Sequence, residues 1–430
     1  MIWSKEEKYT RTEIENIQWE RLKKQIHYAY ESLAPYRKKM EEQKIRPEDI
    51  KTLKDIHKLP FVVKDDFRKE YPFGMFAVPR KAVRRIHASS GTTGKPTVVG
   101  YTKEDLKNWS EQVARIAAMG GATEEDTAQI AFGYGMFTGA LGLHYGLEHI
   151  GADVIPVSSG NTEKQLLFLR DFETTVLVAT PSYALYIAER MEENGYQKKD
   201  FRLRFGLVGG EALSEKMRVE LEERWEADFT QNYGMSELNG PGVSGECLMK
   251  NGMHINEDHF YAEIIDPETL EVLDEGEEGE LVITCLTKEA IPLLRYRTGD
   301  ITRLTKEPCD CGRNFLRMAP LHGRTDDMLV IRGVNLFPSQ IETALENFDE
   351  IGAHYEIEVR RVNHLDVMTI KVELIDFKLL DSFGELERVK KEIKQKIRSV
   401  TGLDSQIRLL APRSLERFEG KARRVKDFRE

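Results

Sequence analysis

Short apolar runs alternate with amphipathic segments between about residues 85 and 235. The runs at 174–180 (TTVLVAT), 204–210 (RFGLVGG) and 228–234 (DFTQNYG) have the length and the bounding turn residues of buried strands. Thr180 ends the first run and can cap the helix expected next, because its side-chain oxygen accepts from a free N–H group of the first turn. This alternation predicts a mostly parallel sheet that helices cover on both faces.

The pattern changes on either side of this region. The stretch 12–43 places apolar residues at roughly helical spacing and predicts one helix. After about residue 240, the runs FYAEIID and GELVITCL predict strands of a small β-rich subdomain. The polar segment 323–327 predicts a joint. Beyond it, a strand, an amphipathic helix that ends near Gly402 and a final strand, IRLLAP, predict an α+β module of about 100 residues.

These elements predict an α/β protein with two domains. Domain 1–325 is expected to contain mixed or parallel sheets flanked by helices, together with the β-rich subdomain, and domain 326–430 is expected to be the small α+β module. A chain of 430 residues is long enough to bury two separate cores.

The composition narrows the possible functions. The chain is 40% hydrophobic and 32% charged, and its net charge of -10 argues against a general nucleic-acid or membrane-surface binder. No apolar run approaches the roughly 20 residues that span a bilayer, and the N-terminus is too polar for a secretory signal. We therefore expect a cytoplasmic protein with no nucleic-acid or membrane partner.

One glycine-rich segment has the chemistry of a phosphate cradle. It combines hydroxyl side chains, two glycines and a lysine, and it reads Ser89, Ser90, Gly91, Thr92, Thr93, Gly94, Lys95, Pro96 and Thr97. Glycines let backbone N–H groups approach an anion, hydroxyls add donors and lysine adds charge. The segment is not a Walker A loop, because Ser89 stands where that pattern needs its first glycine and Pro96 follows the lysine. The alternative is a flexible polar hairpin, and the density of donors favours a phosphate site.

Six segments together resemble one enzyme family. HASSGTTGKPT, GLVGGEALSE, QNYGMSE, RYRTGD, GRTDDMLVIRGVNLFPSQIE and EGKARRV follow in order between residues 87 and 425. In these segments the chain resembles the phenylacetate–CoA ligase family of the adenylate-forming superfamily. The resemblance implies an enzyme that uses ATP and Mg²⁺ to activate an aryl carboxylic acid, first of all phenylacetate, as an acyl-adenylate. The acyl group would then pass to coenzyme A, with release of AMP and pyrophosphate, and family habit implies a homodimer.

The resemblance also assigns nucleotide contacts. Tyr233 resembles the tyrosine that packs on adenine, as a flat ring suits a purine face. Asp300 resembles the carboxylate that accepts from both ribose hydroxyls, and Arg324 resembles an arginine that reaches the nucleotide. The other residues that the resemblance places at the nucleotide are Gly209, Gly210, Glu211, Asn232, Gly234, Met235 and Ser236.

The resemblance in the same segments also assigns the magnesium ligand, the catalytic lysine, the hinge and the coenzyme A contact. Glu237 resembles the carboxylate that holds Mg²⁺, a hard cation that takes one or two protein carboxylates when bound with ATP. Lys421 resembles the lysine that catalyses adenylation, because a cation between the carboxylate and the α-phosphate offsets charge in the transition state. Asp326 resembles the hinge about which a mobile C-terminal domain rotates, and Gly333 lies in the segment expected to contact coenzyme A. The alternative for Lys421 is an ordinary lysine in a basic tail.

The segment 131–139 (AFGYGMFTG) alternates aromatic residues with glycines and resembles the acyl-pocket lining of the same family. Aromatic side chains form an apolar wall, and glycines leave room for a ring. Tyr134, Phe137 and Gly139 are the candidate substrate contacts. The alternative is the buried start of a helix.

Three of the four cysteines indicate a possible metal site. Cys309 and Cys311 form a C-x-C-G turn, and Cys247 and His254 lie upstream with six residues between them. Three thiolates and one imidazole make a closed tetrahedral site for a structural zinc ion, provided that the two pairs meet in the β-rich region. The alternative is a set of buried thiols without a metal.

Two other functions fit part of the pattern. An enzyme that adenylates a cofactor carboxylate without transfer to coenzyme A, as coenzyme F390 synthetases similar to this family do, would share the nucleotide site. A regulatory module that binds ATP without turnover would explain the phosphate loop, but not a lysine expected in a separate domain.

Overall fold

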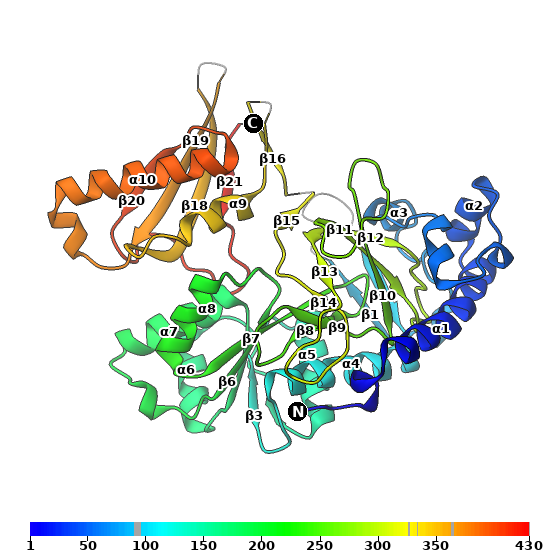
Figure 1. Cartoon of the computed structure of the whole chain (residues 1–430). Helices are drawn as coiled ribbons and strands as arrows, with labels where there is room; N and C mark the ends of the chain where they lie inside the picture. Colours follow the sequence, from blue (N-terminus) through cyan, green and yellow to red (C-terminus); the bar gives the residue numbers. More distant parts are fainter. Residues whose placement is uncertain (90–95, 326, 333, 363–364, 430) are drawn as a thin grey trace.

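A nine-stranded sheet lies at the centre of the computed structural model, which describes residues 1–89, 96–325, 327–332, 334–362 and 365–429 (Figure 1). In spatial order its strands are β13 (Leu304–Thr305), β14 (Arg317–Met318), β9 (Met253–Ile255), β8 (Gly240–Glu246), β7 (Asp228–Met235), β6 (Phe205–Gly209), β5 (Val176–Ala179), β3 (Thr127–Ile130) and β4 (Asp153–Ile155). The five strands from β7 to β4 are parallel, and the others pair antiparallel.

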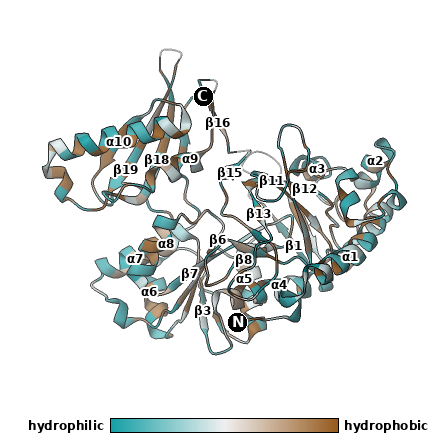
Figure 2. Cartoon of the chain, viewed as in Figure 1, coloured by the Kyte–Doolittle hydropathy of each residue, from teal (hydrophilic) through white to brown (hydrophobic). Residues whose placement is uncertain are grey.

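Helices cover both faces of this sheet. One face packs against α4 (Lys103–Gly120) and α5 (Gly139–Ile150), and the other packs against α6 (Thr162–Asp171), α7 (Pro181–Glu193) and α8 (Glu215–Trp225). Val176 and Val178 of β5 belong to the first core, whereas Leu177 and Ala179 belong to the second. Successive side chains of a strand point to opposite faces, so this strand is buried on both. Figure 2 shows the apolar strands enclosed by helices with hydrophilic outer faces. The predicted mostly parallel, helix-covered sheet is confirmed.

The β-rich region forms a second, antiparallel sheet. Its strands are β10 (Phe260–Ile265), β11 (Gly279–Cys285), β12 (Tyr296–Thr302) and β15 (Gly323–Arg324). The runs FYAEIID and GELVITCL are strands as predicted. A separate antiparallel pair consists of β1 (Arg85–Ala88) and β2 (Val98–Tyr101). Short 3-10 turns occur at η1 (Lys5–Lys8), η2 (Pro47–Asp49), η3 (Leu53–Lys58), η4 (Arg80–Ala82), η5 (Lys198–Asp200) and η6 (Lys378–Asp381).

The N-terminal stretch contains two helices where one was predicted. α1 (Arg11–Ser32) ends before Leu33, and α2 (Ala34–Glu42) follows at once, with α3 (Lys64–Lys69) further along. Leu33 has φ −113° and ψ 90°, outside the helical region. Pro35 lies in the first turn of α2, where its missing N–H is tolerated, but it cannot donate to the preceding turn and so ends α1.

The C-terminal module has a core of its own. Its sheet has the order β20 (Gln406–Leu410), β19 (Leu365–Leu374), β18 (Ile351–Val362) and β21 (Val425–Asp427), and it packs against α9 (Pro338–Leu345) and α10 (Phe383–Thr401). A hairpin of β16 (Leu329–Ile331) and β17 (Val334–Leu336) precedes it. Gly402 closes α10 with φ +71°, as its position predicted.

One prediction for this module is wrong. IRLLAP was expected to be the final strand, but β21 follows it and pairs in parallel with β18. The short, mostly polar segment of β21 has no alternating apolar pattern, so its pairing depends on the sheet edge that it meets. The domain boundary between residues 325 and 326 stays a prediction, because residue 326 lies outside the described residues. Among the described helices, none combines the length and apolar character needed to cross a membrane.

Candidate active site

The candidate active site lies at the carboxyl ends of β5, β6 and β7. These strands are parallel neighbours, so the residues that follow them meet along one edge of the sheet. Thr180 follows β5 and caps α7 as predicted, because its side chain accepts from the N–H of Tyr183 over 3.3 Å. Gly209 ends β6, and Tyr233 lies near the end of β7. Several of the segments that were predicted to bind the nucleotide therefore lie together at this edge.

Asp300 of β12 joins the β-rich sheet to this edge. The hydroxyl of Tyr233 donates to Oδ2 of Asp300 over 2.6 Å, and the guanidinium of Arg324 donates to Oδ1. Asp300 is only 1% exposed. Burial and the nearby Asp300 carboxylate raise the pKa of Tyr233 well above its usual range, so its hydroxyl remains a donor. The three residues assigned to adenine, ribose and nucleotide thus form one hydrogen-bonded group, while their roles toward ATP stay predictions.

Glu237 lies in the turn after β7 and is buried. Its carboxylate makes no hydrogen bond or ion pair with any residue that the structure describes. Nearby, Nζ of Lys288 donates to the main-chain carbonyls of Glu237, over 2.8 Å, and Leu238. Burial lowers the pKa of Lys288. A buried carboxylate is costly unless a donor or cation meets it, so Glu237 fits a ligand of Mg²⁺.

Three glycines of these motifs are required by the local backbone. A Cβ on Gly234 would lie 1.3 Å from the carbonyl oxygen of Gly240, and a Cβ on Gly209 would lie 2.8 Å from that of Asn232. Gly210 has φ +81°, which side chains disfavour. The amide of Asn232 donates to the carbonyl of Val208 over 2.9 Å and so joins the ends of β6 and β7. These residues set the spacing of the strand ends.

The predicted phosphate loop joins two strands, as expected. Its ends, Ser89 and Thr97, directly follow β1 and precede β2, which pair antiparallel. The N–H of Thr97 donates to Oγ of Ser89 over 2.9 Å, and the N–H of Ser89 donates to the carbonyl of Thr97 over 2.9 Å. Ser89 therefore closes the base of the loop. Residues 90–95 lie outside the described residues, so phosphate contacts stay a prediction for Ser90, Gly91, Thr92, Thr93, Gly94 and Lys95.

The predicted acyl-pocket segment lies between β3 and α5 and touches both nucleotide motifs. The N–H of Ala88, next to the phosphate loop, donates to the carbonyl of Met136 over 2.9 Å. Oγ1 of Thr138 lies 3.2 Å from Oγ of Ser236, in the motif after β7. The segment therefore lies beside two of the motifs assigned to the nucleotide, and most of it is loop and not helix. Its role as the lining of the acyl pocket stays a prediction.

The candidate substrate contacts occupy different surroundings. Tyr134 is half-buried, and its hydroxyl lies 3.0 Å from Nδ1 of His144. Phe137 is 52% exposed. Gly139 is the first residue of α5, where a Cβ would lie 3.8 Å from the ring of Phe132. Contact between these residues and an acid stays a prediction.

The Lys421 segment of the C-terminal module lies on the same edge. Oγ1 of Thr180 donates to the carbonyl of Gly420 over 3.1 Å, and the N–H of Ala422 donates to Oε2 of Glu211 over 2.8 Å. The other carboxylate oxygen of Glu211 accepts from the N–H of Ser182 over 2.7 Å. Lys421, whose side chain is exposed, is thus held on both sides at the ends of β5 and β6.

Glu211 was expected to contact adenine, and here it connects the start of α7 with the lysine segment. The predicted hinge residue Asp326 and the predicted coenzyme A contact Gly333 lie outside the described residues.

Away from this edge, the four predicted zinc ligands meet beside β9. Their ligand atoms all lie within 4.8 Å of one another, with Sγ of Cys247 3.7 Å from Sγ of Cys309 and Sγ of Cys311 3.4 Å from Nε2 of His254. Tetrahedral zinc, with Zn–S about 2.3 Å and Zn–N about 2.0 Å, sets S···S near about 3.8 Å and S···N near about 3.5 Å. Nδ1 of His254 faces the carbonyl of Phe315 at 3.3 Å, which orients Nε2 toward the thiols. The donor set and its spacing fit a structural zinc site.

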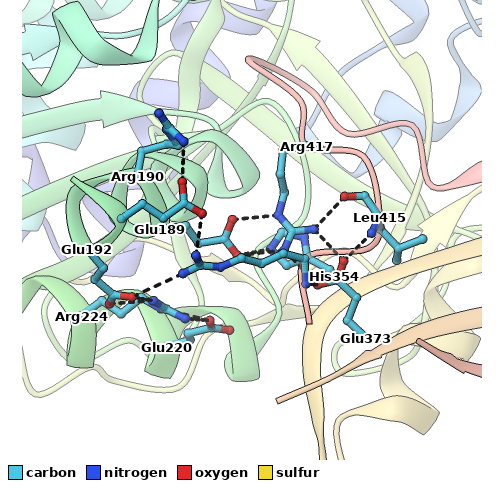
Figure 3. Close-up of polar contacts among 11 residues, drawn as sticks. Glu189, Arg190, Glu192, Glu220, Arg224, His354, Glu373, Leu415 and Arg417 are labelled. Carbon is cyan, nitrogen blue, oxygen red and sulfur yellow. Dashed lines mark hydrogen bonds and ion pairs between the residues drawn. The ribbon is translucent and has the colours of Figure 1, made fainter. Parts of the chain in front are cut away.

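Sequence reasoning missed several polar residues around the site. Lys288 lies in no motif, and a lysine in TKEAIP has the local pattern of a surface residue. Arg417 of the C-terminal module lies between Glu189 of α7 and Glu373 of β19 (Figure 3). These residues carry no signal in the local sequence, because each is recognised only by a partner far away in the chain.

Known families match both parts of the chain. Residues 41–285 match the AMP-binding enzyme family, and residues 333–429 match the AMP-binding enzyme C-terminal domain. Phenylacetate-coenzyme A ligase from Aromatoleum evansii is 46% identical over 98% of this chain and 96% of that protein. Phenylacetate-coenzyme A ligase from Escherichia coli (strain K12) is 45% identical over 97% of this chain and 95% of that protein.

Solved structures extend this likeness to the arrangement of the domains. 2-Hydroxyisobutyryl-CoA ligase in the postadenylation state, in complex with 2-HIB-AMP, is 28% identical and aligns with a TM-score of 0.90 over 99% of this chain and 91% of that one. The same enzyme in complex with 2-HIB-AMP and CoA in the thioesterification state aligns with a TM-score of only 0.73, at 29% identity, over 99% of this chain and 92% of that one. The chain belongs to the phenylacetate–coenzyme A ligase family of AMP-binding enzymes, as its motifs predicted, and is an AMP-forming acid–thiol ligase by class.

Proposed function

We propose that this chain converts phenylacetate, ATP and coenzyme A into phenylacetyl-CoA, AMP and pyrophosphate. The observation that carries the proposal is the meeting of the Lys421 segment with the nucleotide motifs at one sheet edge, where Thr180 and Glu211 hold the residues on either side of the lysine. The named relatives, similar over nearly the whole chain, point to phenylacetate as the acid.

In the first half-reaction, a carboxylate oxygen of the acid attacks the α-phosphorus of ATP, and the bond to the pyrophosphate oxygen breaks. Asp300 accepts from the ribose hydroxyls, and the ring of Tyr233 packs on adenine. Lys421 offsets the charge that develops between the acid and the α-phosphate. Magnesium held by Glu237 would supply positive charge to the phosphates. Positioning and charge therefore produce the rate, and no enzyme nucleophile is needed.

In the second half-reaction, the thiol sulfur of coenzyme A attacks the acyl carbon, the thiol proton is lost, and AMP leaves with the electrons of the broken bond between the acyl carbon and the phosphate oxygen of the mixed anhydride. We propose that the C-terminal domain 326–430 rotates against domain 1–325 between the two steps, with the hinge at Asp326 and with the segment around Gly333 brought to coenzyme A. The separate core of the C-terminal module supports this division. The different TM-scores against two states of one related enzyme support the rotation.

An ATP–pyrophosphate exchange screen over aryl and alkyl acids, repeated with coenzyme A, tests the proposal. Exchange that depends on an aryl acid, with phenylacetate preferred, and thioester formation that depends on coenzyme A are the expected results. Preference for short aliphatic acids would refute the aryl assignment. Release of adenylate with no dependence on a thiol would instead favour an enzyme of the coenzyme F390 synthetase kind.

We also propose that Cys247, His254, Cys309 and Cys311 bind one structural zinc ion, as the spacing of their ligand atoms supports. Zinc would cross-link the loop before β9 to the loop before β14 and leave no open coordination position for chemistry. Elemental analysis of the purified chain should find about one zinc per chain, and Cys311→Ser should lower this content and the melting temperature together. A zinc-free protein of unchanged stability would end this proposal.

We further propose that the chain is cytoplasmic and that it forms a homodimer, as the resemblance to its family implies. Light scattering of the purified protein should give twice the mass of one chain, and a monomer at all concentrations would exclude the dimer.

A further inference from the structure

Arg417 forms a buried ion-pair bridge between the two parts of the molecule. Its Nε and one terminal nitrogen donate to the two oxygens of Glu189 in α7, each over 2.8 Å. The terminal nitrogens also donate to the two oxygens of Glu373 in β19, over 2.9 and 2.8 Å. The Arg417 side chain is 11% exposed, and those of Glu189 and Glu373 are 7% and 4% exposed. One planar cation thus pairs with two carboxylates, one on helix α7 of the large domain and one on strand β19 of the C-terminal module (Figure 3).

The two carboxylates have different tasks. Glu373 also accepts from the main-chain N–H groups of Arg413, over 3.1 Å, and Leu415, over 2.6 Å, so it fixes the segment before Lys421 within its own module. Glu189 is the partner from the large domain. Nε2 of His354 in β18 also lies 3.5 Å from Oε1 of Glu189. Of the two links that Arg417 makes, the link to Glu189 therefore depends on how the two domains are oriented, whereas the link to Glu373 lies within the C-terminal module.

This bridge lies just before the predicted catalytic lysine. Beyond it, Oγ1 of Thr162 donates to the Glu419 carboxylate over 3.0 Å. The contacts of Gly420 with Thr180 and of Ala422 with Glu211 follow. The large domain therefore holds residues 417–422 at four described points, and among these four the Glu189 contact joins two full charges.

We propose that Glu189 and Arg417 are positioning residues for adenylation, whose interdomain ion pair holds Lys421 at the nucleotide and breaks before the second half-reaction. The inference rests on the proposed role of Lys421. It assigns a task to two residues outside the nucleotide motifs.

The surroundings of the pair explain why it is strong enough for this task. Loss of one partner from a buried ion pair is costly, because the other charge stays desolvated and uncompensated. Burial alone would raise the pKa of Glu189, but the contacts with His354 and Arg417 hold it at about 2, so Glu189 stays charged at neutral pH. By contrast, Arg413 reaches Glu193 over 2.5 Å at an exposed site, where water and salt weaken an ion pair.

The test compares the two half-reactions in Glu189→Gln, which keeps the side chain's shape and removes its charge. Acid-dependent ATP–pyrophosphate exchange should fall by about 10- to 100-fold in kcat, because a misplacement of about 1 Å has effects of this size. Thioester formation from synthetic phenylacetyl-adenylate and coenzyme A should be unchanged or faster, since the pair is absent from that state. Equal losses in both half-reactions would mean a general structural role and overturn the proposal.

Two further variants sharpen the result. In the background of Lys421→Ala, Glu189→Gln should cause no additional loss of the remaining exchange, because it acts through that lysine. An additive loss would contradict the proposal. Glu163→Gln is the matched control, since it removes an exposed ion pair with Arg190 inside the large domain and should leave both half-reactions unchanged.

A second variant separates a failure to fold from a loss of function. If Glu189→Gln does not fold, Arg417→Lys gives the same test, because lysine keeps the charge but cannot bridge two carboxylates with a planar fork. If the wild type shows acid-dependent exchange and the folded variant shows the same rate, only the positioning role is overturned. A wild type that shows no acid-dependent exchange would overturn the proposed function and this inference with it.

Discussion

Replacing Gly234 by alanine tests whether the junction of β7 and β8 sets the geometry of the nucleotide site. The register of the two strands shifts between Tyr233 and Met235, so Gly234 lies at an irregular position. An added Cβ would lie 1.3 Å from the carbonyl oxygen of Gly240, whereas real Cβ atoms keep at least 3.0 Å from such atoms. The two backbones must therefore separate by about 1.7 Å. No flexible side chain is available to absorb this change, because the obstacle is main chain.

The expected loss follows from this displacement. Tyr233 adjoins the substituted residue, and its 2.6 Å hydrogen bond to Asp300 cannot survive a shift of that size. Glu237 lies in the turn that the same junction starts. Because about 1 Å of misplacement can reduce a rate by about 100-fold, exchange should fall by at least about 100-fold. Overpacking should also lower the free energy of unfolding by about 1–3 kcal/mol.

Pyrophosphate exchange and urea unfolding measure the two effects. Gly384→Ala is the matched control, since nothing lies within 4 Å of its added Cβ and the residue is in the first turn of α10. It should leave exchange unchanged and stability equal or slightly higher. Wild-type exchange by Gly234→Ala would refute the reasoning that this junction sets the site.

Three further predictions address charge. Asp300→Asn removes a buried charged acceptor and should raise the KM for ATP by about 10- to 100-fold, equivalent to about 1.4–2.8 kcal/mol; a KM within twofold of the wild type would show that Asp300 does not bind the nucleotide. Lys288→Met keeps the buried apolar stem but leaves two main-chain carbonyls near Glu237 without their donor. The free energy of unfolding in urea should therefore fall by about 1–3 kcal/mol, and exchange should need more Mg²⁺. An unchanged Mg²⁺ requirement would show that Lys288 does not support the metal site. Burial holds the pKa of His259 at about 4 despite the nearby Asp258 carboxylate, against about 6.5 when unfolded. The neutral His259 therefore contributes up to about 3 kcal/mol of stability above pH about 6.5, and this contribution is lost as the pH falls toward 4. His259→Gln should flatten this part of the curve of unfolding free energy against pH, and parallel curves for the two proteins would contradict the prediction.

Local structure and the chemistry of the motifs could be predicted from neighbouring residues along the chain. The strand ending at Thr180 and the capped helix after it follow from neighbouring residues, because a cap needs only an oxygen beside free N–H groups. The glycines at 209, 210 and 234 and the Cys and His ligand types are equally local, since backbone space and donor chemistry depend on residue type. The order of the six segments was enough to predict the family.

Which of these residues meet, and which residues outside the motifs support them, depends on the folded chain. Tyr233 and Asp300 bond across 67 positions, and Glu211 reaches Ala422 across 211. The local pattern of α7 marks Glu189 as an ordinary helix residue, and Lys288 looks like a surface lysine until the fold buries it. These contacts could not be predicted locally, because the partner of a buried charge or of an edge strand lies far away in the sequence. Sheet topology and domain docking supply that partner, and with it the burial that makes the contact strong.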